Sequence, residues 1–148
     1  MGLRAAIGRG PVALDTAAFI YFIEDHPRYA PLVAPLFADA DRGVRLIVTS
    51  ALTLLEVLVV PYRSGDLALA GQYETILSHG RGVRLVELDR TQLRTAAELR
   101  AAHRVRTPDA LQLAAALTQR CSAFVTNDRA MPAVAGMRIL QLSDHVVR

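Results

Sequence analysis

Short apolar runs and longer stretches with a helical pattern alternate along most of the chain. Short runs rich in Val, Ile and Leu, bounded by polar residues or glycine, are typical of strands buried in a sheet. Five such runs occur, at residues 12–14, 46–49, 84–88, 123–126 and 138–142. The stretches between them predict six helices, at residues 17–24, 29–40, 51–63, 67–78, 91–103 and 108–120.

Several predicted helices begin at residues that suit a helix N-terminus. Asp66 and Asp89 can cap the fourth and fifth helices. The last helix is predicted to have Thr107 as its N-cap, Pro108 at its first position and Asp109 in its first turn. Alternating strands and helices predict an α/β fold, with a central parallel sheet of about five strands and helices on both faces. A length of 148 residues suits a single domain.

Composition narrows the class of protein. Apolar residues make up 52% and charged residues 21% of the chain, which predicts a folded protein. No apolar run reaches the roughly 20 residues of a membrane span. Residues 1–10 are a poor signal peptide and suggest a leader or a start-site extension. Cys121 is the only cysteine, so no intrachain disulfide can form, which suits the cytoplasm.

Charge adds a candidate partner. The net charge is +3, and the sequence contains arginine but no lysine. Arginine side chains match phosphate groups in shape and charge, so a nucleic-acid partner is one interpretation. A basic protein without such a partner is the other.

Four carboxylates are predicted to lie at the carboxyl edge of the sheet, where ligands bind in parallel α/β folds. Asp15 directly follows the first strand, and Asp128 follows the fourth. Asp109 begins the helix that leads into the fourth strand, and Glu56 lies in the helix after the second. The three aspartates also have structural interpretations, as helix caps, dipole partners or turn residues.

Glu56 is surrounded in its helix by mostly apolar residues, and the nearest basic residue on that face is Arg63, two turns away. A carboxylate on such a face is expected to need a partner. A divalent cation would serve Glu56 and neutralise the other three acids. All-oxygen ligands suit Mg²⁺ or Mn²⁺ rather than Zn²⁺. The sequence has no HExxH, CxxC, P-loop or GxGxxG pattern.

The four acids occur in the stretches "ALDTAAFIYFIE", "TSALTLLEVLVVPYRSGD", "RTPDALQLAAAL" and "AFVTNDRAM". Together, in this order and spacing, these stretches resemble the PIN domain, and in particular the VapC-type toxins of bacterial toxin–antitoxin pairs. The resemblance runs from about Val12 to Leu142 and leaves the first ten residues outside it. One departure is Ala17, where relatives often carry Asn or Ser.

The resemblance implies a PIN-like fold and a Mg²⁺- or Mn²⁺-dependent endoribonuclease that acts as a toxin. It implies that Asp15, Glu56, Asp109 and Asp128 are the catalytic and metal-binding residues. Thr16 corresponds to the family's hydroxyl after the first acid. A small antitoxin protein, an RNA substrate, and a homodimer or larger complex are the partners implied.

Other polar residues near the acids are candidates to contact RNA. Thr126 and Asn127 are expected to hold water or phosphate, and Arg104, Arg106 and Arg129 to hold the RNA backbone; the alternative for the arginines is a solvated surface. The alternative function is a non-catalytic PIN-like module that binds RNA or protein, and the presence of all four acids favours the enzyme. A phosphatase of the haloacid-dehalogenase type is disfavoured, because "DTAAF" lacks the second Asp of DxDxT.

Overall fold

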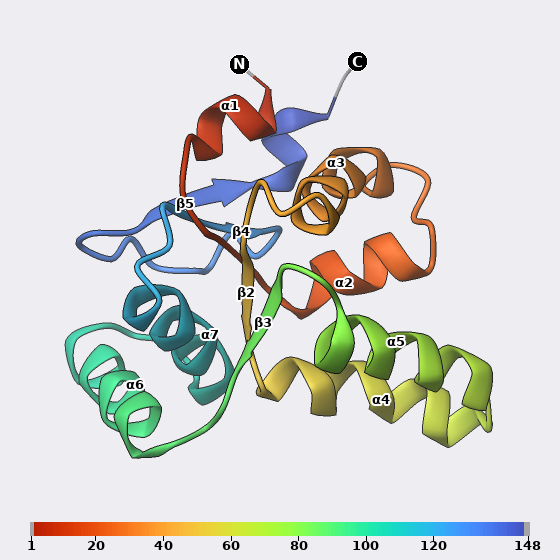
Figure 1. Ribbon diagram of the computed structural model, residues 1–148. Helices are drawn as coiled ribbons and strands as arrows, with labels where there is room; N and C mark the ends of the chain where they lie inside the picture. Colours follow the sequence, from red (N-terminus) through yellow and green to blue (C-terminus); the bar gives the residue numbers. More distant parts are fainter. Residues whose placement is uncertain (1, 147–148) are drawn as a thin grey trace.

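The computed structural model describes residues 2–146, and within this range five strands form one sheet in which every pairing is parallel (Figure 1). The order across the sheet is β3-β2-β1-β4-β5. The strands are β1 (Val12–Leu14), β2 (Ile47–Ser50), β3 (Val83–Val86), β4 (Ala123–Thr126) and β5 (Arg138–Gln141). The predicted α/β class with a central parallel sheet is confirmed, and each predicted strand agrees with the observed one to within two residues.

The helices connect these strands. The described range contains α1 (Leu3–Ile7), α2 (Thr16–Ile23), α3 (Ala30–Asp41), α4 (Leu52–Ser64), α5 (Leu67–His79), α6 (Arg90–Ala102), α7 (Thr107–Thr118) and the 3₁₀ helix η1 (Leu142–His145). The six predicted helices correspond to α2 through α7, again to within two residues at each end. The short helix α1 was not among the predicted elements.

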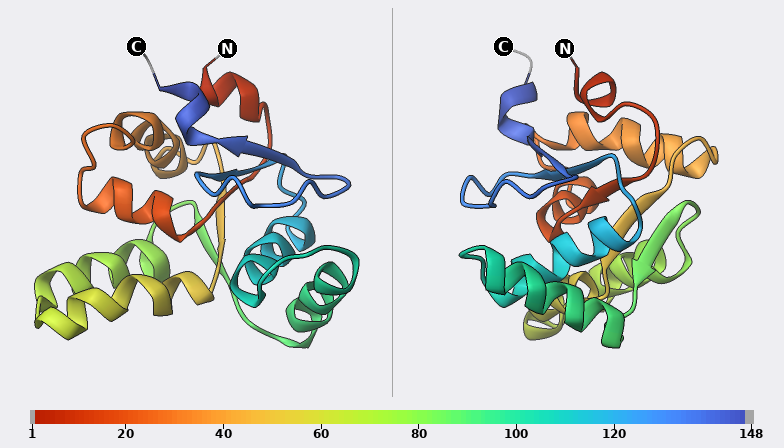
Figure 2. Two further views of the ribbon diagram at one scale, coloured as in Figure 1. Left: turned by 180° about the vertical axis from the view of Figure 1, so that it is seen from behind. Right: turned by 90° about the vertical axis from the view of Figure 1, so that its left-hand side faces the viewer.

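Side chains alternate between the two faces of each strand, so the core is divided into two layers. Val12 and Leu14 belong to a layer that also contains residues from α1, α2, α3, α4 and α5. Ala13 belongs to the second layer, which is built largely from α6 and α7. Figure 2 shows the two groups of helices on opposite sides of the sheet. The fold therefore has helices on both faces, as predicted.

Local capping decides where several helices begin. The carboxylates of Asp66 and Asp89 each accept a hydrogen bond from the backbone N–H three residues later, at 3.0 Å, which confirms both predicted caps. The prediction for Thr107 was wrong. α7 begins at Thr107, with Arg106 in the N-cap position and no side-chain cap. The Thr107 hydroxyl instead accepts a hydrogen bond from Arg100 at 2.9 Å, because α6 lies alongside.

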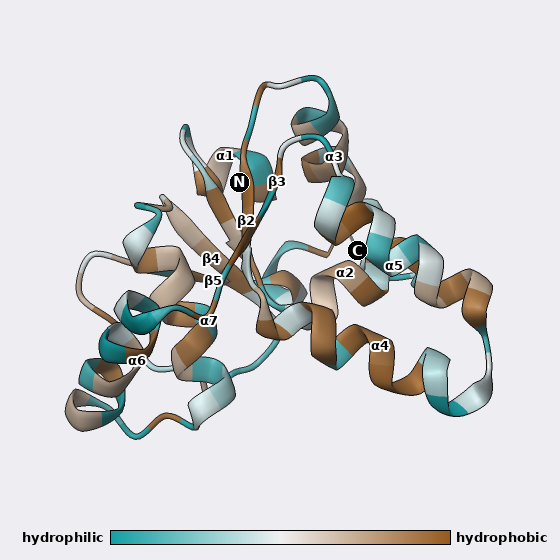
Figure 3. Ribbon diagram, turned by 60° about the horizontal axis from the view of Figure 1, so that its bottom comes forward, coloured by the Kyte–Doolittle hydropathy of each residue, from teal (hydrophilic) through white to brown (hydrophobic). Residues whose placement is uncertain are grey.

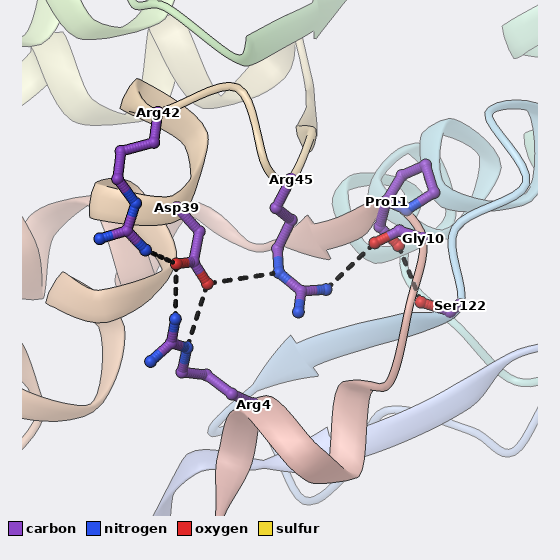
Figure 4. A network of polar contacts seen from close by, with 7 residues as sticks. All are labelled: Arg4, Gly10, Pro11, Asp39, Arg42, Arg45 and Ser122. Carbon is purple, nitrogen blue, oxygen red and sulfur yellow. Dashed lines mark hydrogen bonds and ion pairs between the residues drawn. The ribbon is translucent and has the colours of Figure 1, made fainter.

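An ionic network around a buried carboxylate joins α1 to the amino edge of the sheet (Figure 4). The Asp39 side chain is only 2% exposed and is paired with Arg4 and Arg42, each at 2.6 Å, and with Arg45 at 3.9 Å. A buried carboxylate needs such partners to offset its loss of hydration. Helix α1 lies within residues 1–10, for which the sequence suggested a leader or start-site extension. Through this network and its apolar side chains, α1 packs on the body of the fold.

Helices α4 and α5 lie side by side and extend beyond the sheet (Figures 1 and 3). Several large apolar side chains of α4 are exposed, including Leu55 at 62% and Val60 at 64%, together with Val59 and Tyr62. The apolar character of α4 is visible as brown ribbon in Figure 3. Over residues 2–146, no helix is both long enough and apolar enough to span a bilayer.

Candidate active site at the carboxyl edge of the sheet

Asp15 lies at the end of the central strand β1 and has two roles at once. Its Oδ1 atom caps α2 by accepting a hydrogen bond from the Ala18 N–H at 3.3 Å. Its Oδ2 atom accepts a hydrogen bond from the Thr126 hydroxyl at 2.5 Å. β1 and β4 pair with Leu14 opposite Val125, so Asp15 and Thr126 emerge side by side at the same edge.

The environment of Asp15 disfavours its charged form. The pKa of its carboxyl is raised from 3.8 to about 6, chiefly by burial and in smaller part by the negative charges of Asp128 and Asp109. The hydrogen bonds from Thr126 and Ala18 oppose this shift. Asp15 is therefore held near other acids in a place where its negative charge is poorly solvated.

Asp109 lies in the first turn of α7, as predicted. Burial raises the pKa of its carboxyl, and the charge of Asp128 adds to the increase. Arg106 opposes the shift, with its Nε atom 3.7 Å from the Asp109 carboxylate. The Arg106 side chain is 82% exposed, so it lies at the rim of the site rather than within it.

Asp128 follows β4, and its hydrogen bonds stabilise the turn there. It therefore also has the role of a turn residue, which was the structural alternative in the sequence analysis. Its Oδ1 atom accepts a hydrogen bond from the Ala130 N–H at 2.9 Å. Its own N–H donates to the Thr126 hydroxyl at 3.0 Å. Thr126 is fully buried, and this one hydroxyl joins the backbone of Asp128 to the carboxylate of Asp15. Thr126 thus has partners within the protein on both its donor and its acceptor side.

Glu56 lies on α4 and is held by α2. The Thr16 hydroxyl donates a hydrogen bond to its Oε1 atom at 2.7 Å. The sequence argument that Glu56 is desolvated on an apolar face was wrong, because the residue is exposed. Exposure arises because the outer face of α4 carries apolar side chains that are themselves uncovered, such as Leu55 and Val60.

A cleft of about 350 Å³ opens between these elements. Its lining consists of Asp15, Thr16, Ala17, Glu56, Arg106, Pro108, Asp109 and Gln112. Three of the four predicted acids therefore border one cleft, and the fourth, Asp128, is close enough to raise the pKa of two of them. The structure thus brings the four acids to one edge of the sheet, while their role in binding a metal stays a prediction.

The four carboxylates do not form a ready-made metal site. Among the described residues, no group of three or more histidine, cysteine or acidic side chains is arranged so that it could hold an ion. The expectation that all four meet within bridging distance of one ion is therefore not met by the side chains as they lie. Three of these carboxylates are turned toward hydrogen-bond donors within the protein: Asp15 toward Thr126 and Ala18, Glu56 toward Thr16, and Asp128 toward Ala130.

The chemistry of this edge nevertheless fits Mg²⁺ or Mn²⁺. All the side-chain donors of the four acids and of Thr16 are oxygen atoms, the type of ligand that these cations prefer. Arg106 is the basic residue among those that line the cleft. The pKa values of Asp15 and Asp109 are raised because their negative charges are poorly stabilised at these positions. A bound cation would stabilise those charges.

Two of the other candidate RNA contacts have partners within the protein. Asn127 accepts a hydrogen bond from the Ser143 N–H at 2.9 Å and donates one to the Tyr21 hydroxyl at 3.4 Å. Arg129 forms an ion pair with Asp144 at 2.5 Å. Asn127 and Arg129 thus join the end of β4 to η1. Arg104 is exposed in the loop before α7.

Sequence reasoning missed Gln112, which lines the cleft yet is only 4% exposed. Its signal was present: it is a polar residue within the apolar stretch "ALQLAAAL", one turn after Asp109 and on the same side of the helix. It contacts Thr16, Thr49 and Thr53, which come from two other helices and a strand.

A family model for the PIN domain matches residues 12–137. This is most of the chain, and all four predicted acids lie inside the matched range. The chain therefore belongs to the PIN domain family. Comparison with curated proteins gives no significant match.

Several solved structures share the fold. VapBC2 from Rickettsia felis, bound to a DNA fragment from its promoter, has a TM-score of 0.66 at 17% identity, covering 88% of this chain and 98% of its own. A toxin–antitoxin complex from Klebsiella pneumoniae has a TM-score of 0.64 at 20% identity, with coverages of 85% and 94%. DNA-bound VapBC from Salmonella typhimurium has a TM-score of 0.61 at 18% identity, with coverages of 90% and 98%. At these identities the likeness is one of fold.

Proposed function

We propose that this PIN domain is a Mg²⁺- or Mn²⁺-dependent endoribonuclease that hydrolyses phosphodiester bonds of RNA. The main observation in support of this proposal is the position and the raised pKa of the Asp15 carboxyl. Its carboxyl lies at the end of the central strand, and burial together with the charges of Asp109 and Asp128 raises its pKa to about 6. Such perturbed acids at the carboxyl edge of a parallel sheet are typical of catalytic sites.

Each acid has a distinct part in this proposal. Asp15, Asp109 and Asp128 would hold the cation, since burial makes the negative charges of Asp15 and Asp109 costly without one and Asp128 adds a third negative charge nearby. Glu56 has Oε1 occupied by the Thr16 hydroxyl, which leaves Oε2 available to the ion or to a water molecule. The chemistry that a bound Mg²⁺ or Mn²⁺ supplies is activation of water and stabilisation of charge on the phosphate.

Arg106 is the residue best placed to hold the RNA backbone. It lines the cleft, and its guanidinium is exposed while remaining 3.7 Å from Asp109. A guanidinium can form paired hydrogen bonds with a phosphate. Arg129 is engaged with Asp144, so its contact with RNA would require that pair to open.

The test is cleavage of RNA by the purified protein, with Mg²⁺ or Mn²⁺ compared with a chelator. We expect cleavage only with the metal, and none by the Asp15→Asn variant. Asp66→Asn is the matched control, because Asp66 is also a helix N-cap but lies on α5 with an exposed side chain. Cleavage that survives in Asp15→Asn would contradict the assignment of the site.

A non-catalytic module that binds RNA or protein is the second candidate. It is favoured by one observation: the described residues contain no group of acids already arranged around an ion. If this candidate is correct, the protein binds RNA with equal affinity in Mn²⁺ and in chelator and leaves the RNA intact under both conditions. Metal-dependent cleavage by the wild type would dismiss it.

We further propose that the enzyme is the toxin of a toxin–antitoxin pair and acts in the cytoplasm with a small antitoxin as partner. Two observations support this. The structures with the same fold include toxin–antitoxin complexes. In addition, α4 exposes Leu55, Val59 and Val60 beside Glu56, and an apolar surface next to an acidic cleft suits a partner that covers both. The working form would be a homodimer or a larger complex with the antitoxin.

Expression in cells tests the toxin role. The wild type expressed alone should arrest growth, while Asp15→Asn should be harmless at the same level of soluble protein. Co-expression with the small open reading frame next to the gene should restore growth. Harmless expression of a folded, soluble wild type would argue against a toxin and leave the question of cleavage to the purified protein.

A further inference from the structure

Gln112 occupies an unusual place for an uncharged polar residue. It lies on α7 one turn after Asp109, borders the cleft, and is almost completely buried. A buried amide is costly unless its donors and acceptors have partners. The partners of Gln112 therefore indicate what its side chain does.

The orientation of the Gln112 amide is set by its contact with the backbone of β2. Oε1 accepts a hydrogen bond from the Ser50 N–H at 3.2 Å. A backbone N–H can only donate, so this contact identifies the oxygen of the amide without ambiguity. Nε2 consequently points the other way, toward the hydroxyls of Thr53 at 2.8 Å and Thr16 at 3.5 Å.

Counting protons then gives the direction of the remaining bonds, because each hydroxyl has only one proton to donate. The Thr16 hydroxyl accepts a hydrogen bond from Gln112 Nε2 and donates one to Glu56 Oε1 at 2.7 Å. One chain of donors thus begins at the Gln112 amide and ends at the Glu56 carboxylate.

A second chain begins at the other proton of the same amide. Thr53 receives it, and Thr53 lies 2.7 Å from Thr49. The Thr49 hydroxyl has the Leu14 carbonyl at 2.9 Å as its nearest acceptor that cannot donate, and Gln112 Oε1 lies farther away at 3.4 Å. With its one proton given to either of these, Thr49 accepts from Thr53. This chain ends on the carbonyl that immediately precedes Asp15.

We propose that Gln112 is a positioning residue of the acidic site. Its single amide supplies the first donor of both chains, one of which holds Glu56 while the other holds the strand end that carries Asp15. Gln112 and Asp109 lie on the same helix, α7. The amide therefore links the positions of three of the four acids: Asp15, Glu56 and Asp109. This inference rests on the proposed nuclease function, for which it names a residue that touches neither metal nor RNA.

A matched control exists in the same protein. Gln92 on α6 is also 4% exposed, and its Nε2 atom donates to the Thr118 hydroxyl at 2.6 Å. Thr118 is at the far end of α7 from Asp109, roughly 14 Å along the helix at 1.5 Å per residue. Gln92→Met and Gln112→Met therefore each remove a buried amide of the same size, but only the second removes one from the site.

The experiment compares the two variants in thermal denaturation in chelator, in Mn²⁺ binding by titration calorimetry, and in cleavage of RNA with Mn²⁺. Both variants should lose thermal stability, Gln112→Met the more because its amide makes more hydrogen bonds. Only Gln112→Met should lose Mn²⁺ affinity and kcat, each by about 10- to 100-fold, the loss typical of residues that orient ligands. Thr16→Ser, which keeps the hydroxyl, should retain both properties, whereas Thr16→Val should lose them.

Double variants separate positioning from general damage. If the chain runs through Thr16, then Gln112→Met should lower Mn²⁺ affinity little further in the Thr16→Val background, and the two losses of melting temperature in chelator should be less than additive. Wild-type Mn²⁺ affinity in Gln112→Met, or fully additive losses, would overturn the inference. The melting and Mn²⁺ measurements need no RNA. If the wild type binds Mn²⁺ but cuts no RNA, the proposed nuclease activity is refuted, and the positioning role of Gln112 is still tested by these two measurements.

Discussion

The replacement of Asp15 by Asn should make the metal-free protein more stable while abolishing the proposed activity. In the folded protein the pKa of Asp15 is about 6, against an ordinary value of 3.8. A difference of about two pH units corresponds to about 3 kcal/mol of unfolding free energy at 1.36 kcal/mol per unit. Asn carries no charge, is as good an N-cap as Asp, and can still bond to Thr126. We expect a net gain of about 1–3 kcal/mol at neutral pH, allowing for one weakened hydrogen bond.

The sign of the pH dependence follows from the same two pKa values. Well below pH 4, Asp15 is protonated in both the folded and the unfolded chain, and its ionisation contributes nothing to the difference between the variant and the wild type. Between pH 4 and 6 the unfolded chain loses its proton first, so the wild type should become progressively less stable than Asp15→Asn. Above pH 6 the difference should stay constant. The pH range over which the two curves separate thus reports the pKa of Asp15 in the folded protein.

The assay is urea or thermal denaturation of both proteins in chelator, from pH 4 to 7.5. A gain of 1–3 kcal/mol should raise the melting temperature by about 3–10 °C for a chain of this length. Asp66→Asn is the control, because it removes a capping carboxylate from an exposed position on α5. The stability of Asp66→Asn relative to the wild type should not increase between pH 4 and 6. The reasoning fails if Asp15→Asn is no more stable than the wild type at pH 7.5, or if their difference does not change with pH.

Three further predictions concern the metal and the polar networks. Millimolar Mg²⁺ or Mn²⁺ should raise the melting temperature of the wild type through binding to the folded state, and Asp109→Asn should shrink that rise; an equal rise in both would place the metal elsewhere. Asp39→Asn should destabilise the protein by about 1–3 kcal/mol in urea denaturation, because it removes the charge of a buried carboxylate that pairs with the largely buried Arg45 and with the exposed Arg4 and Arg42, whereas the exposed Asp41→Asn should have little effect. Thr126→Val removes a hydrogen bond that lowers the pKa of Asp15, so that pKa, followed by NMR titration of the carboxyl carbon, should rise above about 6; an unchanged value would show that the Thr126 hydroxyl does not lower it.

The comparison of sequence and structure shows which features depend on near neighbours alone. The strands, the six longer helices and the caps at Asp66 and Asp89 could all be predicted, because spacing of apolar residues and capping depend on residues within a few positions. The parallel sheet followed from the alternation of elements. Since the carboxyl ends of parallel strands lie at one edge, Asp15 and Asp128 could also be placed near each other.

Where a residue's environment comes from distant segments, prediction from the local pattern failed. Glu56 was expected to be desolvated, but its exposure depends on whether another segment covers its face of α4, and in residues 2–146 that face stays exposed. Thr107 was expected to cap α7, yet its hydroxyl is engaged by Arg100 of α6. Asp39 lies 35 positions from Arg4, its partner across the amino edge of the sheet.

The sequence by itself determined the class of fold, the positions of its elements and the four acids at the ends of strands and helices. Only the tertiary structure decided the strand order, with β1 between β2 and β4, and through it the contact of Thr126 with Asp15, 111 positions apart. It also decided the partners of Gln112, which come from three separate segments. The physical reason is that hydrogen bonds act over about 3 Å, so their partners are known only once the sheet has brought distant segments together.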